Sequence, residues 1–404
     1  PRLHAPVQLP HSPWFGDRSG QPPVPATTPR VLPEDAAVVL VTIDAVRADV
    51  LSDPANAALL PTLTALATTG VVFTQARSAG SQTALSLSAL FSGRPFSSQS
   101  WTEHGHGWSR FPYPAEDSSE RFPAILSAHG VTTSDFQGVA FLAGDYGVVR
   151  GFRDETVIAD GAHFAKASDL VDRMMIRLRR ARGPAFLYAH LMEPHAPHDS
   201  GRADGTERER YLSEIAVADA QIARIRRQLE ARFPGRWALF VSADHGEAFG
   251  EHGTYQHGKS LYEELVHVPL LAASPAFTAR HIDQRVSLVD LGPTILDLFD
   301  LPTPPSFLGE SLVPLLTGHD VTLTRPLFAE GRLRRELTSR EGLVTIEDLR
   351  RKVVEVYDLE SDPGETRNLF DAEPARGDVG LATLRAFFGG HERKQDGYAP
   401  AFTP

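Results

Sequence analysis

The chain contains no cysteine among its 404 residues. This absence excludes disulfide frameworks, thiolate metal sites and cysteine nucleophiles together. Long apolar runs are also missing, because Val38–Ile43 ends at Asp44 and His267–Ala273 contains Pro269, well short of the ~18 residues of a membrane span. No basic block is present, and 40 Lys and Arg face 51 Asp and Glu. Such an acidic chain is a poor candidate for binding nucleic acid or an anionic membrane surface.

The remaining composition is that of an ordinary globular protein. Apolar residues make up 42% and charged residues 23%, which excludes disordered and fibrous classes. The length predicts two domains, or one large domain with an appendage. The sequence begins at Pro1 rather than Met, so we expect a processed or trimmed product that has lost any signal or anchor segment.

Residues 1–35 and 36–318 differ in proline content and in hydrophobic pattern. The first segment is rich in proline and predicts an extended arm on the surface. The second alternates β-branched runs with amphipathic stretches, which predicts an α/β sandwich with a mostly parallel central sheet and helices on both faces. The predicted strands are Ala36–Ile43, Val131–Phe136, Ala185–Leu191 and Trp237–Val241. The predicted helices are Leu60–Thr68, Ala84–Phe91, Ala167–Arg180 and Tyr211–Ala231.

Residues 319–404 are expected to form a smaller α+β subdomain. The pattern predicts a small antiparallel sheet followed by a closing helix. The predicted strands are Arg325–Glu330, Glu341–Thr345 and Lys352–Tyr357, and the predicted helix is Val379–Phe388.

Polar side chains follow several of the predicted strands. They are Asp44 after the first, His190, Glu193 and His195 after Ala185–Tyr188, Asp244 and His245 after Ala238–Val241, and His257 further on. The carboxyl ends of parallel strands meet at one edge of a sheet, so these side chains are expected to gather there. Each alone reads as a helix cap or an ordinary histidine. Together they form a carboxylate and imidazole set that suits zinc or manganese.

A hydroxyl-rich segment, Gly80–Arg94, is the remaining candidate for chemistry. A turn of small residues precedes a helix, and Ser81, Thr83 and Ser86 place hydroxyls in an exposed turn at its start. There the helix dipole and free amides stabilise an anion. The alternative is an N-cap hydroxyl without chemistry. His104, His106 and His252 lie in glycine-rich loop sequence and are expected to be bystanders.

At these residues the chain resembles the sulfatase-like branch of the alkaline phosphatase superfamily, from about Ala36 to Leu369. The resemblance rests on an ordered set of motifs rather than on any single one. They are Val41–Asp49, Phe91–Arg94, Leu187–Pro197, Tyr211–Gln221, Ser242–Glu247, His257–Glu264, Val286–Thr294 and Val356–Glu365. The resemblance implies an alkaline-phosphatase-like fold and an enzyme.

The chain departs from the sulfatases at the nucleophile. Sulfatases place there a Cys or Ser that is oxidised to formylglycine, followed by Pro or Ala and by Arg. Here the equivalent residue is Thr83, its Pro and Arg partners are absent, and Ala45 replaces a second Asp. Thr83–Ser86 instead resembles the nucleophile segment of phosphoethanolamine transferases, and lipoteichoic acid synthases also use Thr. The Val356–Glu365 segment remains sulfatase-like, and the disulfides of the transferases are absent.

The resemblance implies a division of labour. One divalent ion, with zinc expected first and manganese or calcium as alternatives, would be held by Asp44, Thr83, Asp244 and His245, and it would favour the Thr83 alkoxide. His195 and His257 would contact substrate oxygens and protonate the leaving group, or hold a second ion. His190 also matches the transferases and, with Lys259, is expected to bind substrate. Lys259 as a plain surface lysine is an equal alternative, and Arg47 and Asp49 are read as supporting residues.

The sequence therefore predicts a metal-dependent hydrolase or transferase of phosphate esters, of phosphodiester or phosphonate type, with a phospho-Thr83 intermediate. The substrate would be lipid- or glycan-linked or small, and the protein extracytoplasmic, periplasmic or at the cell surface, with any membrane attachment through an upstream segment absent from this sequence. Two alternatives stay open. One is a sulfuric ester hydrolase that works without formylglycine, and the other is an inactive binding protein on the same scaffold.

Overall fold

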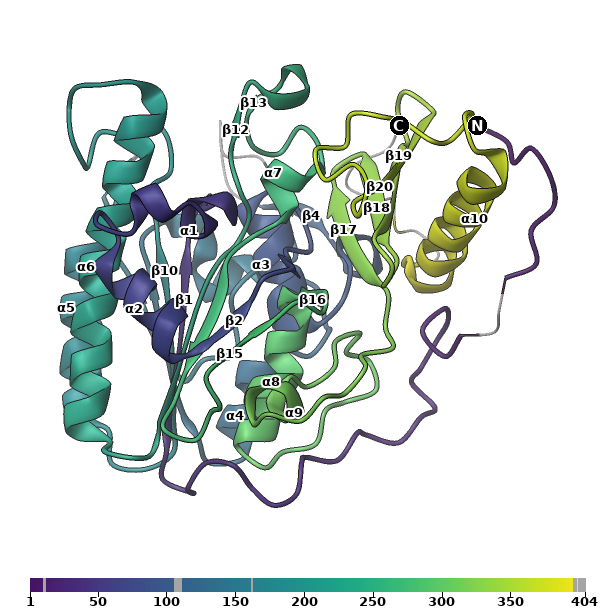
Figure 1. Cartoon of the computed structure of the whole chain (residues 1–404). Coiled ribbons are helices and arrows are strands. Elements are labelled where there is room, and N and C mark those ends of the chain that lie inside the picture. The colour runs from purple at the N-terminus through teal and green to yellow at the C-terminus, as the bar shows by residue number, and fades with distance from the viewer. Residues whose placement is uncertain (10–11, 105–110, 161–162, 395–397, 399–404) are drawn as a thin grey trace.

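The computed structural model describes residues 1–9, 12–104, 111–160, 163–394 and 398. At its centre lies a sheet with the strand order β15-β2-β14-β11-β1-β10-β6-β7 (Figure 1). The strands in chain order are β1 (Ala37–Ile43), β2 (Val71–Phe73), β6 (Thr132–Gln137), β7 (Asp154–Val157), β10 (Ala185–Leu191), β11 (Trp237–Ala243), β14 (Leu270–Ala273) and β15 (Arg280–Ile282). All four predicted strands are confirmed, and so is the mostly parallel sheet.

The three middle strands set the position of the functional residues. β1 pairs in parallel with both β10 and β11, and all of its residues are buried, as a strand covered on both faces requires. The register places Ile43 opposite Leu191 on one side and Ala243 on the other. The residues that leave β1 and β11 next are Asp44 and Asp244, so the two carboxylates emerge at the same edge.

Helices cover both faces of this sheet, as predicted (Figure 1). On one face α2 (Pro61–Thr69), α5 (Ala167–Arg180) and α6 (Glu207–Arg232) pack together. On the other face lie α3 (Thr83–Ser92), α4 (Phe122–Ala128) and α8 (Leu291–Leu298). α6 begins with a capping box between Thr206 and Glu209 and buries a stripe of apolar residues at helical spacing.

The region after residue 318 contains a separate antiparallel sheet and a long helix. The sheet comprises β17 (Leu327–Gly331), β18 (Arg334–Thr338), β19 (Leu343–Asp348) and β20 (Val353–Asp358). The helix is α10 (Pro374–His391), which packs on β18, β19 and β20. Strand β18 is missing from the sequence prediction, because its first three residues, Arg334 to Glu336, are charged and lack the β-branched signal.

The remaining elements are short. The helices are α1 (Asp49–Ser52), α7 (Glu263–Val266) and α9 (Val313–Leu316). The paired strands are β3 (Ala76–Arg77) with β16 (Val286–Ser287), β4 (Thr102–His104) with β5 (Phe111–Tyr113), β8 (Ala159–Asp160) with β9 (His163–Phe164), and β12 (Ala248–Phe249) with β13 (Tyr255–Gln256).

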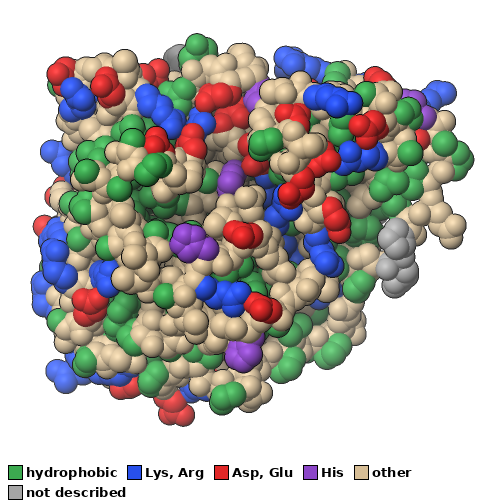
Figure 2. Space-filling model, viewed as in Figure 1, with side chains coloured by type: hydrophobic (Ala, Val, Ile, Leu, Met, Phe, Trp, Pro, Cys, Tyr) green, Lys and Arg blue, Asp and Glu red, His purple; other side chains and the backbone are tan. Residues whose placement is uncertain are grey.

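The proline-rich arm runs from α10 along the outside of the molecule to β1 (Figure 1). Its contacts are specific. The backbone N–H of His4 donates to Asp378 of α10 at 2.7 Å, and that of Thr27 donates to Asp297 of α8 at 2.6 Å. Within the described ranges, no helix has the length and apolar character needed to cross a bilayer. On the face shown in Figure 2, basic and acidic side chains are interspersed.

Candidate active site

The carboxylates of Asp44 and Asp244 form the floor of the candidate site. Both follow central strands and both are fully buried. The backbone N–H groups of Ala45 and His245 donate to Asp244 Oδ1 at 3.2 and 3.0 Å. The second oxygen, Asp244 Oδ2, lies 3.4 Å from His245 Nε2. One oxygen of Asp244 is thus held in place by the backbone while the other faces the site.

Helix α3 brings the Thr83 hydroxyl to these groups. Thr83 is its first residue and is 7% exposed, so it is buried rather than in an exposed turn as expected. Its Oγ1 lies 3.2 Å from Asp44 Oδ2 and 3.2 Å from His245 Nε2. The other two candidate hydroxyls are committed to backbone carbonyls, since Ser81 donates to Ser260 and Ser86 donates to Asp244. Thr83 is therefore the hydroxyl of the three that faces the acidic groups.

His190 joins the same cluster from within β10. Its Nε2 lies 3.2 Å from Asp44 Oδ2, and its Nδ1 lies 2.8 Å from Thr42 Oγ1. Thr42 is also 2.7 Å from the Tyr188 hydroxyl, so a buried polar chain orients the ring. Burial opposes protonation of His190, but the hydrogen bond and charge of Asp44 and the charge of Asp244 outweigh it and raise its pKa.

The donor set fits a divalent cation. One ligand atom each from Asp44, His190 and Asp244 lies within 4.8 Å of the others, and all three residues are buried. Asp44 Oδ1 and Asp244 Oδ2 are buried without a hydrogen-bond partner. Unpaired buried carboxylate oxygens are costly, and a bound metal ion satisfies them. His190 thus joins the predicted ligands Asp44, Thr83, Asp244 and His245 as a donor at the same centre.

Asp44 is held in its ionised form. Burial alone would raise the pKa of Asp44, but the hydrogen bond from His190 and the charges of His195, His245 and His190 outweigh burial and lower it. A deprotonated carboxylate is the form that coordinates a metal ion.

His257 and His195 line the open side of the cluster. The ring of His257 lies 4.4 Å from that of His245 and 5.2 Å from that of His195, measured between centroids. His257 Nδ1 faces Glu247 Oε1 at 3.3 Å, and His195 Nδ1 faces the Ala196 carbonyl at 2.7 Å. In both rings Nδ1 is therefore engaged with a protein acceptor, and Nε2 is the ring nitrogen left to contact substrate or metal.

Glu247 has no role in the sequence prediction, although it lies in the Ser242–Glu247 motif. It is buried and its carboxylate contacts His257. Burial opposes protonation of His257, but the hydrogen bond that His257 donates to Glu247 and the charges of Asp44, Glu247 and Asp244 outweigh burial and raise its pKa. The signal that marks Glu247 is its place three residues after Asp244, yet only the fold shows that it reaches His257.

The remaining predicted residues lie further out. Lys259 is exposed on the loop after His257, and its Nζ donates to the Tyr255 carbonyl at 3.1 Å. Arg47 ties loops together, because it pairs with Asp49 and Glu251 and also donates to the Glu247 carbonyl at 3.0 Å.

Two of the histidines expected to be bystanders make packing contacts with aromatic side chains. His104 packs edge-on against Tyr146, with centroids 4.6 Å apart. His252 stacks on Tyr262 at 3.8 Å and contacts Glu264 at 3.1 Å. His106 lies outside the described residues.

The family comparison defines the class of protein. A model of the family described as Sulfatase matches residues 36–301, more than half of the chain. The chain therefore belongs to the sulfatase family of the alkaline phosphatase superfamily, as its motifs predicted. This is an enzyme family, and members of the superfamily use divalent metal ions.

The relatives are similar over part of their length. An uncharacterized sulfatase of Escherichia coli (strain K12), YidJ, is 30% identical over 190 residues, or 44% of this chain and 35% of that protein. Human arylsulfatase K is 36% identical over 110 residues, or 27% of this chain and 19% of that protein. The chain thus spans about a third or less of these curated relatives.

Solved structures share the fold over most of their length. BT1596, a 2-O GAG sulfatase, superposes with a TM-score of 0.70 at 18% identity, covering 88% of this chain and 91% of that one. The phosphonate monoester hydrolase of Agrobacterium radiobacter superposes with a TM-score of 0.68 at 18% identity, covering 88% of this chain and 96% of that one.

Proposed function

We propose that the protein is a metal-dependent hydrolase or transferase of phosphate esters, with phosphodiesters or phosphonate monoesters preferred, and that Thr83 is its covalent nucleophile. The observation that carries this proposal is the position of the Thr83 hydroxyl. It lies at the start of α3, 3.2 Å from both Asp44 and His245. The fold likeness to a phosphonate monoester hydrolase supports the choice of phosphorus esters.

The metal would be held by Asp44, Asp244 and His245 together with Thr83, and His190 adds a donor on the β10 side. The unpaired oxygens of the two carboxylates support this assignment. When bound, a divalent ion such as zinc supplies the positive charge that favours loss of the Thr83 hydroxyl proton to solvent. A second ion at His195 and His257 is the alternative to their role with substrate.

The reaction has two displacements. In the first, Thr83 Oγ1 forms a bond to phosphorus, the bond from phosphorus to the leaving oxygen breaks, and protonated His257 gives its proton to that oxygen. In the second, water or an alcohol forms a bond to phosphorus, and His257 takes its proton. The bond from phosphorus to Thr83 Oγ1 breaks as the new bond forms, and Thr83 takes back a proton from solvent. His195 would contact the phosphoryl oxygens, and Lys259 would add positive charge nearby.

A sulfuric ester hydrolase acting without formylglycine is the second candidate. Family membership and the fold likeness to a 2-O GAG sulfatase favour it. Thr83 weighs against it, because a secondary hydroxyl is not a precursor of the formylglycine aldehyde on which sulfatases depend. The site retains both carboxylates and the hydroxyl, which weighs against an inactive binding protein.

A panel of chromogenic esters separates these candidates. Phosphate monoesters, phosphate diesters, phosphonate monoesters and sulfate esters of one phenol are assayed with zinc, manganese and calcium. We expect the phosphorus esters to be turned over much faster than the sulfate ester. This turnover should depend on the metal and should be lost in Thr83→Ala. Turnover of the sulfate ester alone would assign the protein to the second candidate, and no turnover with any metal would favour the binding protein.

The cellular setting is part of the proposal. We infer an extracytoplasmic enzyme acting on a phosphate ester carried by a lipid, a glycan or a small molecule. Fractionation of cells that express the full gene tests the location, and recovery in the cytoplasm would contradict it.

A further inference from the structure

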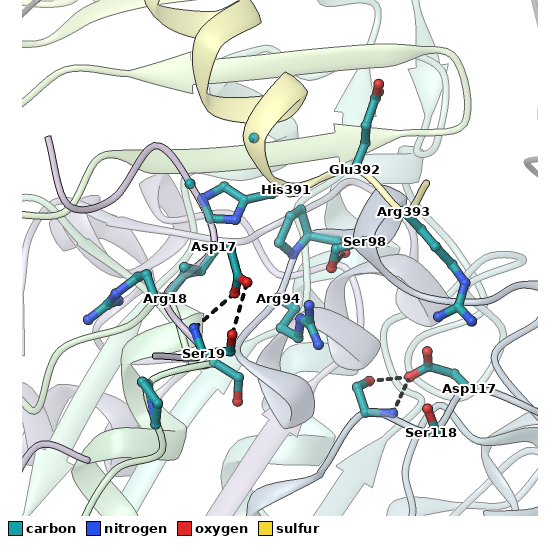
Figure 3. Close-up of a pocket in the computed structure, with 17 residues that line it drawn as sticks. Asp17, Arg18, Ser19, Arg94, Ser98, Asp117, Ser118, His391, Glu392 and Arg393 are labelled. Atoms are coloured by element: carbon teal, nitrogen blue, oxygen red, sulfur yellow. Dashed lines mark hydrogen bonds between the residues drawn. The ribbon is translucent and has the colours of Figure 1, made fainter. Parts of the chain in front are cut away.

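A cavity lies at the opposite end of α3 from Thr83. It has a volume of about 430 Å³ and is lined by the segments 16–19, 94–98, 117–119, 305–308 and 390–393 (Figure 3). Because α3 has ten residues, roughly 15 Å separate its two ends. None of the candidate catalytic or metal-binding residues lines this cavity.

Arg94 is fixed in the middle of the cavity by the end of α3. Gly93 ends the helix with φ +65°, a conformation that favours glycine, and a Cβ there would lie 2.4 Å from Phe307 Cδ1. The conformation of Gly93 therefore fixes the direction in which the backbone leaves α3, and with it the position of Arg94. Across the residues that the structure describes, the partly buried Arg94 guanidinium has neither a hydrogen-bond nor an ion-pair partner. In Figure 3 it lies between Asp17 and Asp117, below His391.

The acidic groups around the cavity are already engaged. Asp17 accepts hydrogen bonds from the backbone N–H and the hydroxyl of Ser19, both at 2.9 Å. Asp117 forms a buried ion pair with Arg121 at 3.1 Å. The Glu392 side chain points away from the cavity in Figure 3 and pairs with Arg335 at 2.9 Å.

Arginines from three segments of the chain contribute to the cavity lining. Arg18, Arg94 and Arg393 all line the cavity. Arg18 stacks on Trp14 at 3.8 Å and donates to the Phe307 carbonyl at 3.2 Å, which holds its charge in place. Asp117 pairs with Arg121 and Glu392 with Arg335, so the remaining carboxylate of the lining is that of Asp17, on one side of the Arg94 guanidinium. Burial lowers the pKa of His391, and the charges of Arg94 and Arg18 lower it further, against the opposing effects of its hydrogen bond to Trp14 and the charge of Asp17.

We propose that this cavity binds a tetrahedral oxyanion, a phosphate or sulfate group that is either free or carried on a small ligand such as a sugar ester, with Arg94 as its principal partner. A guanidinium fork matches the oxygens of such a group and binds them through two parallel hydrogen bonds. The volume falls within the usual range for small-ligand sites. The site is independent of the proposed hydrolase activity.

Calorimetry with three variants tests the site. Inorganic phosphate, inorganic sulfate and glucose 6-sulfate are titrated into the metal-loaded protein, into Arg94→Gln and into Arg227→Gln. Arg227 is an exposed residue of α6 remote from the cavity lining, so its variant controls for the change in net charge. We expect Arg94→Gln to lose one binding event, or to weaken it at least about tenfold, as removal of a charge-assisted hydrogen bond predicts. Arg227→Gln is expected to match the parent.

Asp17→Asn provides a test that misfolding cannot imitate. Asp17 is exposed on the arm, and asparagine keeps an acceptor for Ser19 while removing the one uncompensated negative charge. We expect this variant to bind the anion several-fold more tightly than the parent. Equal binding of the free anions and the sugar ester identifies a free-anion site, and binding of the ester alone identifies an ester site. Isotherms that are the same for the parent, Arg94→Gln and Asp17→Asn would overturn the proposal.

Discussion

Glu247 and His257 form a carboxylate–imidazole pair at the rim of the site, with 3.3 Å between Glu247 Oε1 and His257 Nδ1. The proposed first step needs protonated His257, so His257→Ala should reduce turnover about 10²- to 10⁴-fold. His281→Ala, at an exposed position of β15, is the matched control and should leave turnover unchanged. Equal losses in the two variants would remove His257 from the mechanism.

The same pair predicts a change in pH dependence. Glu247 raises the pKa of His257, so the acid form persists to higher pH in the parent and is lost as pH rises through that raised pKa. Glu247→Gln removes the negative charge and lowers the pKa, and the alkaline limb of the pH–rate profile should therefore move to lower pH. A profile that keeps its alkaline limb would show that another group sets it.

Asp135 is a buried carboxyl away from the metal-binding cluster, and it predicts a pH-dependent stability. Burial, helped by the charge of Glu155, raises the pKa of Asp135 to about 8. Its folded pKa exceeds its unfolded value, so its stability contribution is complete below the unfolded pKa and is lost as pH rises towards 8. Relative to Asp135→Asn, the parent should lose up to about 1.4 kcal/mol of unfolding free energy per pH unit between pH 4 and 8. Urea unfolding at pH 5 and 7.5 measures this, and a pH-independent difference would contradict it.

At the scale of elements, α6 holds the loop that follows β1. The Tyr211 hydroxyl donates to the Ala45 carbonyl at 2.9 Å and accepts from the Arg47 backbone N–H at 3.0 Å. Ala45 has φ +56°, an unfavourable conformation for a residue with a Cβ, so the loop that presents Asp44 depends on such anchors.

Tyr211→Phe should therefore destabilise the fold and loosen the site. One buried and one partly buried backbone group lose their partner, which costs about 1–3 kcal/mol of unfolding free energy. Metal affinity should fall with it, because Asp44 is no longer held in position. Tyr255→Phe, at an exposed residue of β13, is the control. Unfolding curves and metal titration measure both effects. A Tyr211→Phe variant with parental metal affinity would show that the loop after β1 keeps its conformation without the Tyr211 hydroxyl.

The sequence predicts four of the eight strands of the central sheet, β1, β6, β10 and β11, and three of them, β1, β10 and β11, are the continuous apolar runs typical of strands covered on both faces. It misses β2, β7, β14 and β15, because three or four residues carry too little pattern. Strand ends then bring Asp44 and Asp244 together by topology alone. The pattern fails where tertiary contacts decide. β18 is charged at its start and becomes a strand through pairing with β17 and β19. Glu247 lies on no strand end, and its approach to His257 depends on how two loops fold back.

Thr83 illustrates the same limit within the site. The motif identifies it, but an exposed turn was expected, whereas the structure buries it between Asp44 and His245. That burial follows from α3 being enclosed along its whole length, with every residue from Thr83 to Ser92 buried. A helix with serines at three of its ten positions does not look buried from its sequence. Its serine hydroxyls are nevertheless satisfied inside the protein, as Ser92 is by the Ser88 carbonyl.

At the scale of the whole molecule, metal binding should couple to stability. The cluster joins side chains of β10 and α3 with the residues that directly follow β1 and β11. Without a cation, the unpaired oxygens of Asp44 and Asp244 repel one another. Zinc at about 100 times its Kd should add about 2.7 kcal/mol to the unfolding free energy, and a chelator should remove it. Thermal melting with and without metal measures the shift. Asp244→Asn should abolish it, and an unchanged melting temperature in the parent would contradict the metal site.

The most direct test of the central claim is mass spectrometry of a reaction quenched during turnover of a phosphodiester or phosphonate monoester. The account predicts a phosphoryl or phosphonyl group on the peptide that contains Thr83, an unmodified threonine in the resting enzyme, and no adduct in Thr83→Ala, which should also lose turnover by roughly three orders of magnitude or more. Thr83→Ser should keep part of the turnover and form the adduct on serine. Turnover at the parental rate by Thr83→Ala, or steady turnover with no adduct on Thr83 at any quench time, would contradict the account.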